Sequence, residues 1–245
     1  MSTPSIVLVH GAWHGTWCWS SVQPALEERG FSVIAVQLPG VGAAPPGDLE
    51  SDARAVRLVL DAVEGPVVVC AHSYGGIVMT EATAGAPNVV GLIYLCAFML
   101  DVGQSLLSAV GTPPPWWSIH AEQNVIRLHE PECALYNDCT PEQTMAAMQQ
   151  VRPQSLPTFA QPLRSASWHD IPSAYVVCDR DEAIPPEIQK AMATQASHVE
   201  HLDTGHSPFL SRPRELSDLI AKLAVTVLNG GGPVTNARPL AGSRR

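Results

Sequence analysis

The chain has 245 residues, of which 46% are hydrophobic and 15% charged, and its formal net charge is −9. This length and hydrophobic content suit one sizeable domain with a single core and exclude general disorder. The acidic balance argues against nucleic acid as a partner, and no apolar run is long enough for a membrane span. The N-terminal residues lack the basic region and long apolar stretch of a secretory signal, so residues 6–9 predict a strand.

The six cysteines are scattered along the chain and form no C-x-x-C pair. Cys70, Cys96 and Cys178 lie within or at the ends of apolar, strand-like runs. Such thiols are typical of buried, reduced cysteines, so we expect a cytoplasmic protein. A disulfide between Cys133 and Cys139 would require an accidental meeting within one loop and is not expected.

Strands and helices are predicted to alternate through the first hundred residues. Apolar runs predict strands, and amphipathic patterns between them predict helices at 16–29, 49–63 and 77–84. The predicted strands are 6–10, 31–36, 67–72 and 89–97. Their nearly continuous apolar content indicates that helices cover both faces of a parallel sheet. We therefore expect an α/β fold.

The alternation stops between about residues 101 and 170. This segment carries three consecutive prolines at 113–115, and its pattern predicts a helix near 118–129. A second helix is predicted to begin after Thr140, because Thr140 is a good N-cap and Pro141 suits the first helical position. We expect the segment to be a helical insert that caps the ends of the strands.

The alternation resumes after the insert with a strand at 174–178 and a helix at 186–196, followed by a strand at 198–202 and a helix at 208–228. The sequence therefore predicts a core formed by residues 1–100 and 171–228, a cap formed by 101–170 and a flexible tail at 229–245.

The most informative stretch is VVVCAHSYGG at residues 67–76, which predicts a strand, a sharp turn and a helix. A serine at such a turn is held in a strained conformation with its hydroxyl exposed at the end of the sheet. Ser73 is therefore a candidate nucleophile. Ala71 replaces the first glycine of the G-x-S-x-G pattern, and it is small enough for close contact between strand and helix. Taken alone, the pattern leaves an ordinary strand-to-helix connection open.

A serine nucleophile needs a base and a group that orients the base. The carboxyl ends of parallel strands lie at one edge of a sheet, so candidates should follow later strands. We assign His206 as the base, because it follows the last predicted strand, and Asp181 as the orienting carboxylate. Asp179 and Asp101 remain rivals, and Asp181 could instead cap its own turn.

Two backbone N–H groups would stabilise the oxyanion that forms when serine attacks an ester. Tyr74 begins the helix after Ser73, where the helix dipole assists, and Ala12 lies in the loop after the first strand. His10 is interpreted as a structural residue that holds this loop, and His72 is expected to point away from the nucleophile.

No metal or nucleotide site is expected. His10 and His14 are four residues apart, but they lie at a strand end and in a loop, and no glutamate follows His10. The sequence has no G-x-G-x-x-G after the first strand and no phosphate-binding loop.

In combination, these motifs resemble the α/β-hydrolase superfamily, in particular its branch of plant methyl esterases, hydroxynitrile lyases and similar bacterial carboxylesterases. The resemblance rests on residues 7–15, 71–76, 135–142, 175–186 and 203–209. It implies a hydrolase without cofactors, with Ser73, His206 and Asp181 as catalytic triad and the amides of Ala12 and Tyr74 as oxyanion hole.

The lyases of this branch carry a threonine near Gly11 and a lysine directly after the catalytic histidine. This chain has Gly11 itself and, after His206, Ser207. Without that lysine there is no evident cation to stabilise a leaving cyanide, so the resemblance favours an esterase over a lyase.

The leading hypothesis is a cytosolic hydrolase that cleaves a small hydrophobic ester or lactone through an acyl-enzyme. Lyase chemistry, C–C bond hydrolysis and a ligand-sensing receptor on the same frame remain alternatives. Aromatic residues could line a pocket for an aromatic or alicyclic ester, or form the insert's own core. They are Trp13, Trp116, Trp117, Phe159 and Trp168.

Overall fold

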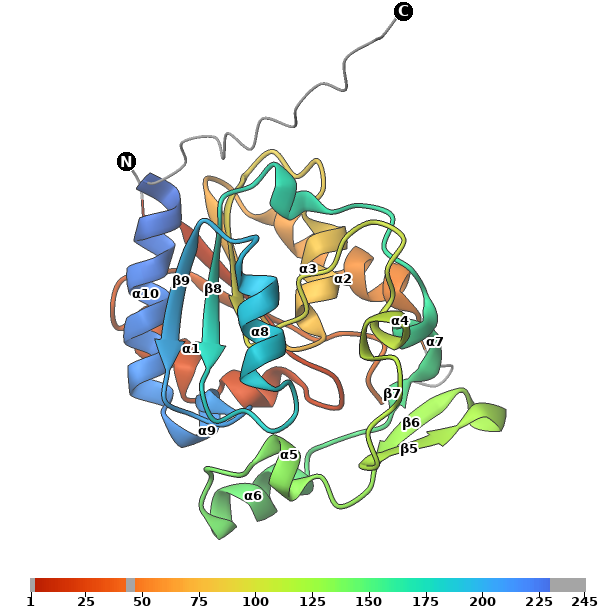
Figure 1. Cartoon of the computed structure of the whole chain (residues 1–245). Helices are drawn as coiled ribbons and strands as arrows, with labels where there is room; N and C mark the ends of the chain where they lie inside the picture. Colours follow the sequence, from red (N-terminus) through yellow and green to blue (C-terminus); the bar gives the residue numbers. More distant parts are fainter. Residues whose placement is uncertain (1–2, 43–46, 230–245) are drawn as a thin grey trace, which may run out of the picture.

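The computed structural model describes residues 3–42 and 47–229 (Figure 1). Apart from residue 229, the tail predicted for 229–245 lies outside the described residues. The main sheet has six parallel strands in the order β2-β1-β3-β4-β8-β9, which confirms the predicted α/β fold. Its strands are β1 (Ser5–Val9), β2 (Val33–Val36), β3 (Val67–His72), β4 (Val89–Leu95), β8 (Ser173–Cys178) and β9 (His198–Leu202).

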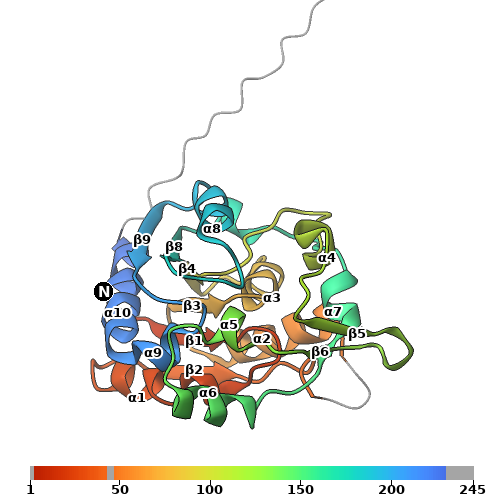
Figure 2. The same cartoon turned by 60° about the horizontal axis from the view of Figure 1, so that its bottom comes forward.

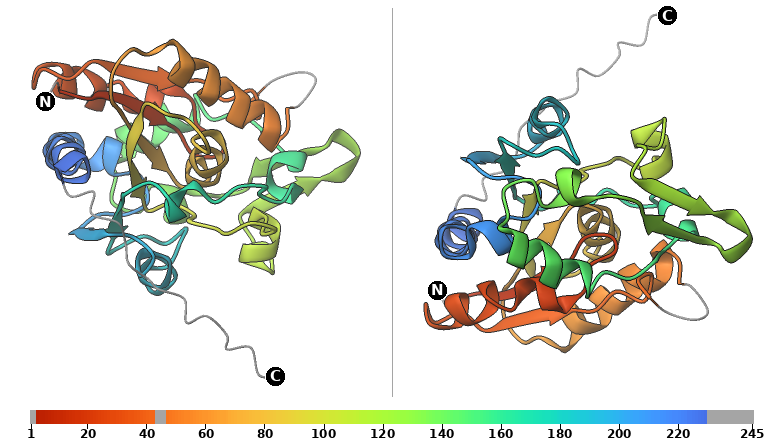
Figure 3. Two further views of the ribbon diagram at one scale, coloured as in Figure 1. Left: turned by 90° about the horizontal axis from the view of Figure 1, so that it is seen from above. Right: turned by 90° about the horizontal axis from the view of Figure 1, so that it is seen from below.

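Helices cover both faces of this sheet. Figure 2 looks onto the ends of the strands, with α1 (Val22–Glu27) and α10 (Pro213–Asn229) on one side of them. On the other side lie α2 (Leu49–Ala62), α3 (Gly75–Ala82) and α8 (Pro186–Ala193). Figure 3 shows α10, in dark blue, and α3, in yellow, on opposite sides of the sheet. Side chains along each strand alternate between the two cores, as Val7 and Leu8 of β1 illustrate.

The strand order places the end of β1 beside the end of β3. From β1 the chain first adds β2 on one side and then crosses to add β3 on the other. Val9 of β1 pairs with Ala71 of β3, so the loop after β1 and the turn after β3 begin at neighbouring points. Ligands of open α/β sheets bind at such topological switch points.

Within the insert, residues 101–170, α5 and α6 lie beyond the arrowheads of the strands, whereas α4 and α7 lie beside the core (Figure 1). It contains short helices and a separate antiparallel sheet with the order β5-β6-β7. Its elements are α4 (Leu106–Val110), β5 (Trp117–His120), η2 (Ala121–Gln123), β6 (Val125–Leu128), α5 (Glu132–Leu135), α6 (Pro141–Met148), β7 (Gln154–Ser155), α7 (Leu156–Ala160) and η3 (Ser167–His169).

The helix predicted near 118–129 is wrong, because this stretch forms the β5–β6 hairpin. The hairpin reverses at Asn124, whose φ of 53° lies in the left-handed region that asparagine tolerates. The predicted start of α6 is confirmed: the Thr140 side chain accepts a hydrogen bond from the backbone N–H of Gln143. Among the helices that the structure describes, none combines the length and hydropathy needed to cross a membrane.

Two predicted helices are interrupted. The one expected at 208–228 divides into α9 (Pro208–Ser211) and α10, because Pro213 disfavours a helical conformation at Arg212 before it. The one expected at 16–29 divides into η1 (Thr16–Trp19) and α1.

Candidate active site

Ser73 occupies the sharp turn between β3 and α3. Its φ of 53° is left-handed, a conformation that stores strain in a non-glycine residue. The two glycines that follow allow the close approach of α3. A Cβ at Gly75 would lie 2.7 Å from the carbonyl oxygen of His10, and one at Gly76 would lie 2.6 Å from that of Phe98. The turn therefore has the strained geometry and the small neighbours that the sequence predicts.

His206 and Asp181 form a buried pair. Nδ1 of His206 lies 2.7 Å from Oδ2 of Asp181, and each residue is 2% exposed. A carboxylate accepts hydrogen bonds, so in this pair Nδ1 is the donor and Nε2 faces away from Asp181. Oδ1 of Asp181 accepts the backbone N–H groups of Ala183 and Ile184, so the residue also caps its own turn.

The rival carboxylates lie elsewhere. Asp179 accepts a hydrogen bond from Nδ1 of His201 at 2.9 Å, on the surface. Asp101 lies 3.3 Å from Nε2 of His169, and both side chains are about half exposed. Of the three candidates, Asp181 is the one that the fold places against His206.

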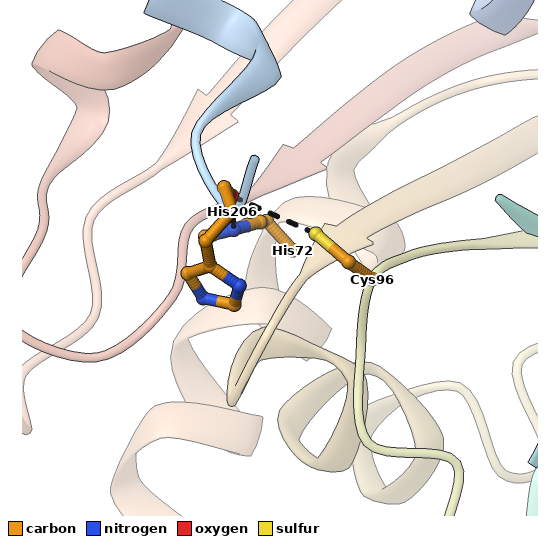
Figure 4. A group of neighbouring side chains, drawn as sticks. All are labelled: His72, Cys96 and His206. Atoms are coloured by element: carbon orange, nitrogen blue, oxygen red, sulfur yellow. Dashed lines mark hydrogen bonds between the residues drawn. The ribbon is translucent and has the colours of Figure 1, made fainter. Parts of the chain in front are cut away.

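Two side chains hold the backbone of His206 (Figure 4). Nε2 of His72 donates to the carbonyl oxygen of His206 at 2.8 Å, and Sγ of Cys96 donates to the same oxygen at 3.6 Å. The two imidazole rings are 4.6 Å apart. Burial lowers the pKa of His72 well below its usual value and raises that of the Cys96 thiol. Both groups are therefore uncharged at neutral pH.

The same three residues offer nitrogen and sulfur atoms within 4.8 Å of one another, a spacing that raises the question of a metal site. Three of the polar atoms already have partners: Nε2 of His72 and Sγ of Cys96 bind a carbonyl, and Nδ1 of His206 binds Asp181. The thiol is also protonated, whereas a metal ligand must be a thiolate. These nitrogen and sulfur atoms therefore serve to hold His206 in place, and they are not arranged to bind a metal ion.

The loop after β1 is held as predicted. Nδ1 of His10 donates to the carbonyl oxygen of Gly11 at 2.8 Å, and Nε2 accepts the N–H of Leu38 at 3.1 Å. Burial lowers the pKa of His10 to about 4, so this imidazole is neutral. A Cβ at Gly11 would lie 2.7 Å from Nδ1 of His72 and 3.0 Å from Cβ of Ser73, which leaves room only for glycine.

Ala12, Ser73, Tyr74 and His206 line one cavity of about 40 Å³. Within residues 3–42 and 47–229, the backbone N–H groups of Ala12 and Tyr74 have no protein acceptor. No hydrogen bond joins Ser73 to His206 among these residues, and the two side chains share the cavity. Catalytic hydrogen bonds are often loose before substrate binds.

Four of the five predicted pocket residues line this cavity: Trp13, Trp116, Trp117 and Phe159. Their rings also pack against one another, with centroids 5.5 Å apart for Trp13 and Trp116 and 5.0 Å apart for Trp117 and Phe159. The two alternative interpretations of these residues, pocket wall and aromatic core, therefore both hold. The fifth residue, Trp168, was expected in the pocket but does not line the cavity. Its indole N–H donates to the carbonyl oxygen of Leu100 at 2.9 Å.

A wider cleft of about 840 Å³ lies outside this cavity, and Trp116 lines both. Glu130, Glu132 and Glu182 also line the outer cleft. Trp116 is therefore a wall between the cavity at Ser73 and the cleft that opens to solvent.

Sequence reasoning missed several residues of the site. The further lining residues are His14, His72, Phe98, Leu106, Val110, Pro114, Leu135, Ala183 and Ile184. It also missed Asn137 of the insert, which donates from Nδ2 to the carbonyl oxygen of Arg180 at 2.7 Å. A Cβ at Gly205 would lie 2.0 Å from Oδ1 of Asn137, so the insert fits closely against the loop of His206. The segment 135–142, which carries part of the family resemblance, was the available signal.

A second buried carboxyl was also missed. Asp52 is fully buried on α2 and accepts hydrogen bonds from the hydroxyl of Tyr74 at 2.7 Å and the N–H of Gly40 at 2.5 Å. Burial raises the pKa of Asp52 to about 7. An acidic residue on an amphipathic helix usually faces solvent, so the sequence pattern gave no sign of this contact.

The comparisons with known proteins agree with this architecture. Residues 6–219 match the sequence model of the Alpha/beta hydrolase family. The chain is 30% identical to alpha/beta hydrolase nvfD of Aspergillus novofumigatus, an alignment covering 91% of this chain and 96% of that protein. It is 29% identical to methylesterase 1 of Arabidopsis thaliana, covering 89% and 95% of the two chains. The solved structure of a pyrethroid hydrolase from Sphingobium faniae JZ-2 superposes with a TM-score of 0.80 at 26% identity, covering 91% and 98%.

Proposed function

The chain belongs to the alpha/beta hydrolase family, and from this premise we propose that it is a serine hydrolase that cleaves a small hydrophobic carboxylic ester or lactone. One observation carries the proposal. The buried pair of His206 and Asp181 and the strained turn of Ser73 converge on a single apolar cavity.

In the proposed acylation step, Oγ of Ser73 attacks the ester carbonyl and Nε2 of His206 takes the hydroxyl proton. Asp181 keeps the proton on Nδ1 and stabilises the imidazolium that forms. The N–H groups of Ala12 and Tyr74 donate to the developing oxyanion, and removing one such donor typically costs about 100- to 1,000-fold in kcat. The C–O bond then breaks, and the leaving alcohol takes the proton from His206.

The deacylation step repeats these roles with water. His206 removes a proton from a water molecule as the water attacks the acyl carbonyl on Ser73. The tetrahedral intermediate collapses, the carboxylic acid leaves, and His206 returns its proton to Ser73.

The chemistry of the cavity supports an uncharged substrate. Its lining contains no lysine or arginine among the residues that the structure describes. Burial keeps two lining histidines neutral, because it lowers the pKa of His14 to about 3 and that of His72 well below the usual value. Lyase chemistry needs a partner for a leaving anion, and it is disfavoured because no lysine or arginine of residues 3–42 and 47–229 lines the cavity beside His206.

The size of the cavity supports a short acyl group. A volume of about 40 Å³ is well below the ~150 Å³ of a cavity that holds benzene. The acyl group would lie in the cavity, on the Ser73 side of Trp116. The alcohol group would extend past Trp116 toward the outer cleft. The free thiols of all six cysteines support the proposed cytoplasmic location.

The proposal is tested with a panel of p-nitrophenyl esters of increasing acyl length and a set of lactones, assayed on wild type and Ser73→Ala. We expect Ser73→Ala to lose at least ~1,000-fold in kcat while keeping its thermal midpoint. Ser20→Ala, at an exposed position, is the matched control and should retain full activity. Undiminished turnover by Ser73→Ala would refute the nucleophile, and a single turnover with tight product retention in wild type would indicate a receptor.

A further inference from the structure

Trp13, directly after the proposed oxyanion donor Ala12, has a φ of 61°. This left-handed conformation is unfavourable for a bulky side chain and persists only where the surroundings impose it. Trp13 is 4% exposed. The question is which part of the fold holds it there.

The insert holds all three hydrogen-bonding groups of Trp13. Its backbone N–H donates to Oε1 of Gln154 at 3.2 Å, and its carbonyl oxygen accepts the N–H of Arg152 at 2.9 Å. Its indole N–H donates to the carbonyl oxygen of Ile126 at 2.9 Å. All three partners belong to residues 101–170, so the conformation of this loop of the core depends on the insert.

The amide orientation of Gln154 follows from its other partner. Nε2 of Gln154 donates to Oγ1 of Thr158 at 2.7 Å, and the hydroxyl of Thr158 gives its own proton to the carbonyl oxygen of Ser155 at 2.6 Å. Oγ1 can therefore only accept from Gln154. The carbonyl end of the Gln154 amide must then face Trp13. Gln154 is completely buried, so no water replaces it.

The peptide unit between Ala12 and Trp13 is fixed at both ends. Gln154 accepts its N–H, and Nδ1 of His14 donates to its carbonyl oxygen at 2.8 Å. Nε2 of His14 in turn accepts the hydroxyl of Tyr136, which also lies in the insert, at 3.0 Å. The Ala12 N–H belongs to the preceding peptide unit, whose carbonyl oxygen on Gly11 accepts from Nδ1 of His10. Fixing the peptide plane after Ala12 restrains its Cα, and so limits how far the preceding unit can turn.

We propose that Gln154, assisted by Tyr136 through His14, is a positioning residue for the oxyanion hole, so that docking of the insert aims the N–H of Ala12. The inference rests on the proposed function. Gln154 does not line the cavity, and its side chain meets the loop of Ala12 at the peptide between Ala12 and Trp13.

The test compares Gln154→Leu with a matched control, Gln143→Leu. Gln143 also joins the insert to the core, because its Nε2 donates to the carbonyl oxygen of Leu210 at 2.8 Å, but it is not bonded to Trp13. We expect Gln154→Leu to lower kcat about 10- to 100-fold and to leave KM within threefold of wild type. This loss in kcat is smaller than the loss expected when an oxyanion donor is removed. Gln143→Leu should lower thermal stability similarly and leave kcat within twofold.

Tyr136→Phe is the milder second variant, should Gln154→Leu not fold. It removes one hydroxyl and should lower kcat about threefold to tenfold in the same direction. A trifluoromethyl ketone, which forms a tetrahedral oxyanion with serine, should bind more weakly to both variants in proportion to their loss of kcat. The corresponding alcohol, which forms no oxyanion, should bind as it does to wild type. An unchanged kcat, a loss confined to KM, or an equal loss in Gln143→Leu would overturn the inference.

Amide hydrogen exchange separates this inference from the proposed function. The peptide covering residues 11–15 should exchange faster in Gln154→Leu than in wild type and Gln143→Leu, whether or not the protein hydrolyses esters. Unchanged exchange would refute the anchoring itself. Faster exchange in a protein without serine-dependent hydrolysis would refute only the proposed reaction.

Discussion

Asp181 and His206 are joined by a hydrogen bond of 2.7 Å between Oδ2 and Nδ1, and the carboxylate that accepts it is held in place by three further donors. The backbone N–H groups of Ala183 and Ile184 bind Oδ1, and Nε2 of Gln189 binds Oδ2 at 2.8 Å. The carboxylate therefore cannot rotate without breaking several hydrogen bonds. Its orientation dictates which nitrogen of His206 carries the proton.

Asp181→Asn should lower kcat by about 1,000- to 10,000-fold. The turn amides at Oδ1 require an acceptor, so the asparagine NH₂ group must face His206 and force the proton onto Nε2. The measurement is kcat for p-nitrophenyl acetate. Asp179→Asn is the control, because Asp179 binds His201 at the surface and should retain wild-type activity. If Asp179→Asn were the damaging change, the acid would be wrongly assigned.

Asp52 should make the stability of the fold depend on pH. Its pKa rises from 3.8 to about 7 on folding, mainly because burial disfavours the charged form. Between these values the folded state keeps a proton that the unfolded state has lost, so stability falls as pH rises, by ~1.4 kcal/mol per unit. Urea unfolding of wild type and Asp52→Asn at pH 5, 6 and 7 measures the difference. We expect the free energy of unfolding of Asp52→Asn, relative to that of wild type, to increase from pH 5 to pH 7. A difference between the two proteins that stays constant with pH would contradict the prediction.

Gly76→Ala should lower both stability and activity. The new Cβ would lie 2.6 Å from the carbonyl oxygen of Phe98 and 2.9 Å from Cβ of Ala97, so α3 must move away from the sheet. We expect a loss of ~2 kcal/mol in the free energy of unfolding and a lower kcat, because Tyr74 is the N-cap of α3 and moves with it. Gly85→Ala, where a Cβ meets no atom within 4 Å, should lose some stability through its φ of 66° and keep its kcat.

Trp116→Ala should extend the range of acyl groups that the enzyme accepts. Removing this wall joins the inner cavity to the outer cleft, so the ratio of kcat/KM for p-nitrophenyl hexanoate over acetate should rise at least ~10-fold. Trp168→Ala is the matched control, because Trp168 lies outside the lining and should leave the ratio unchanged. If the hexanoate-to-acetate ratio rose in Trp168→Ala and not in Trp116→Ala, the acyl group would bind near Trp168 and not behind Trp116.

The parts of the site that local sequence encodes could be predicted. The turn at Ser73 combines an apolar strand, a small residue before the serine and two glycines within ten residues, and each feature has a direct steric reason. His206 and Asp181 could be inferred because strand ends in a parallel sheet meet at one edge. Position alone left Asp179 as a rival of Asp181, since both follow β8 within three residues, and the two are separated by their contacts with His206 and His201.

The parts that depend on distant contacts could not be predicted. The sequence predicts a helix near 118–129, where the structure has the hairpin at 117–128, and one pairing partner of this hairpin, Gln154 of β7, lies 28 residues beyond Ile126. Trp168 cannot be separated from the other tryptophans by sequence, because composition does not show which way a side chain faces. The division of the last helix was different, because Pro213 was a local signal that could have revealed it.

The close fit of Asn137 against Gly205 limits how this protein can be re-engineered. A chimera whose grafted insert carried a larger side chain at position 137 would crowd the backbone at Gly205. Swapping residue 137 and the 203–206 loop together would keep the two surfaces matched. The insert and the loop that carries His206 therefore form a matched pair, and we expect a transplant of the insert alone to disturb the position of that loop.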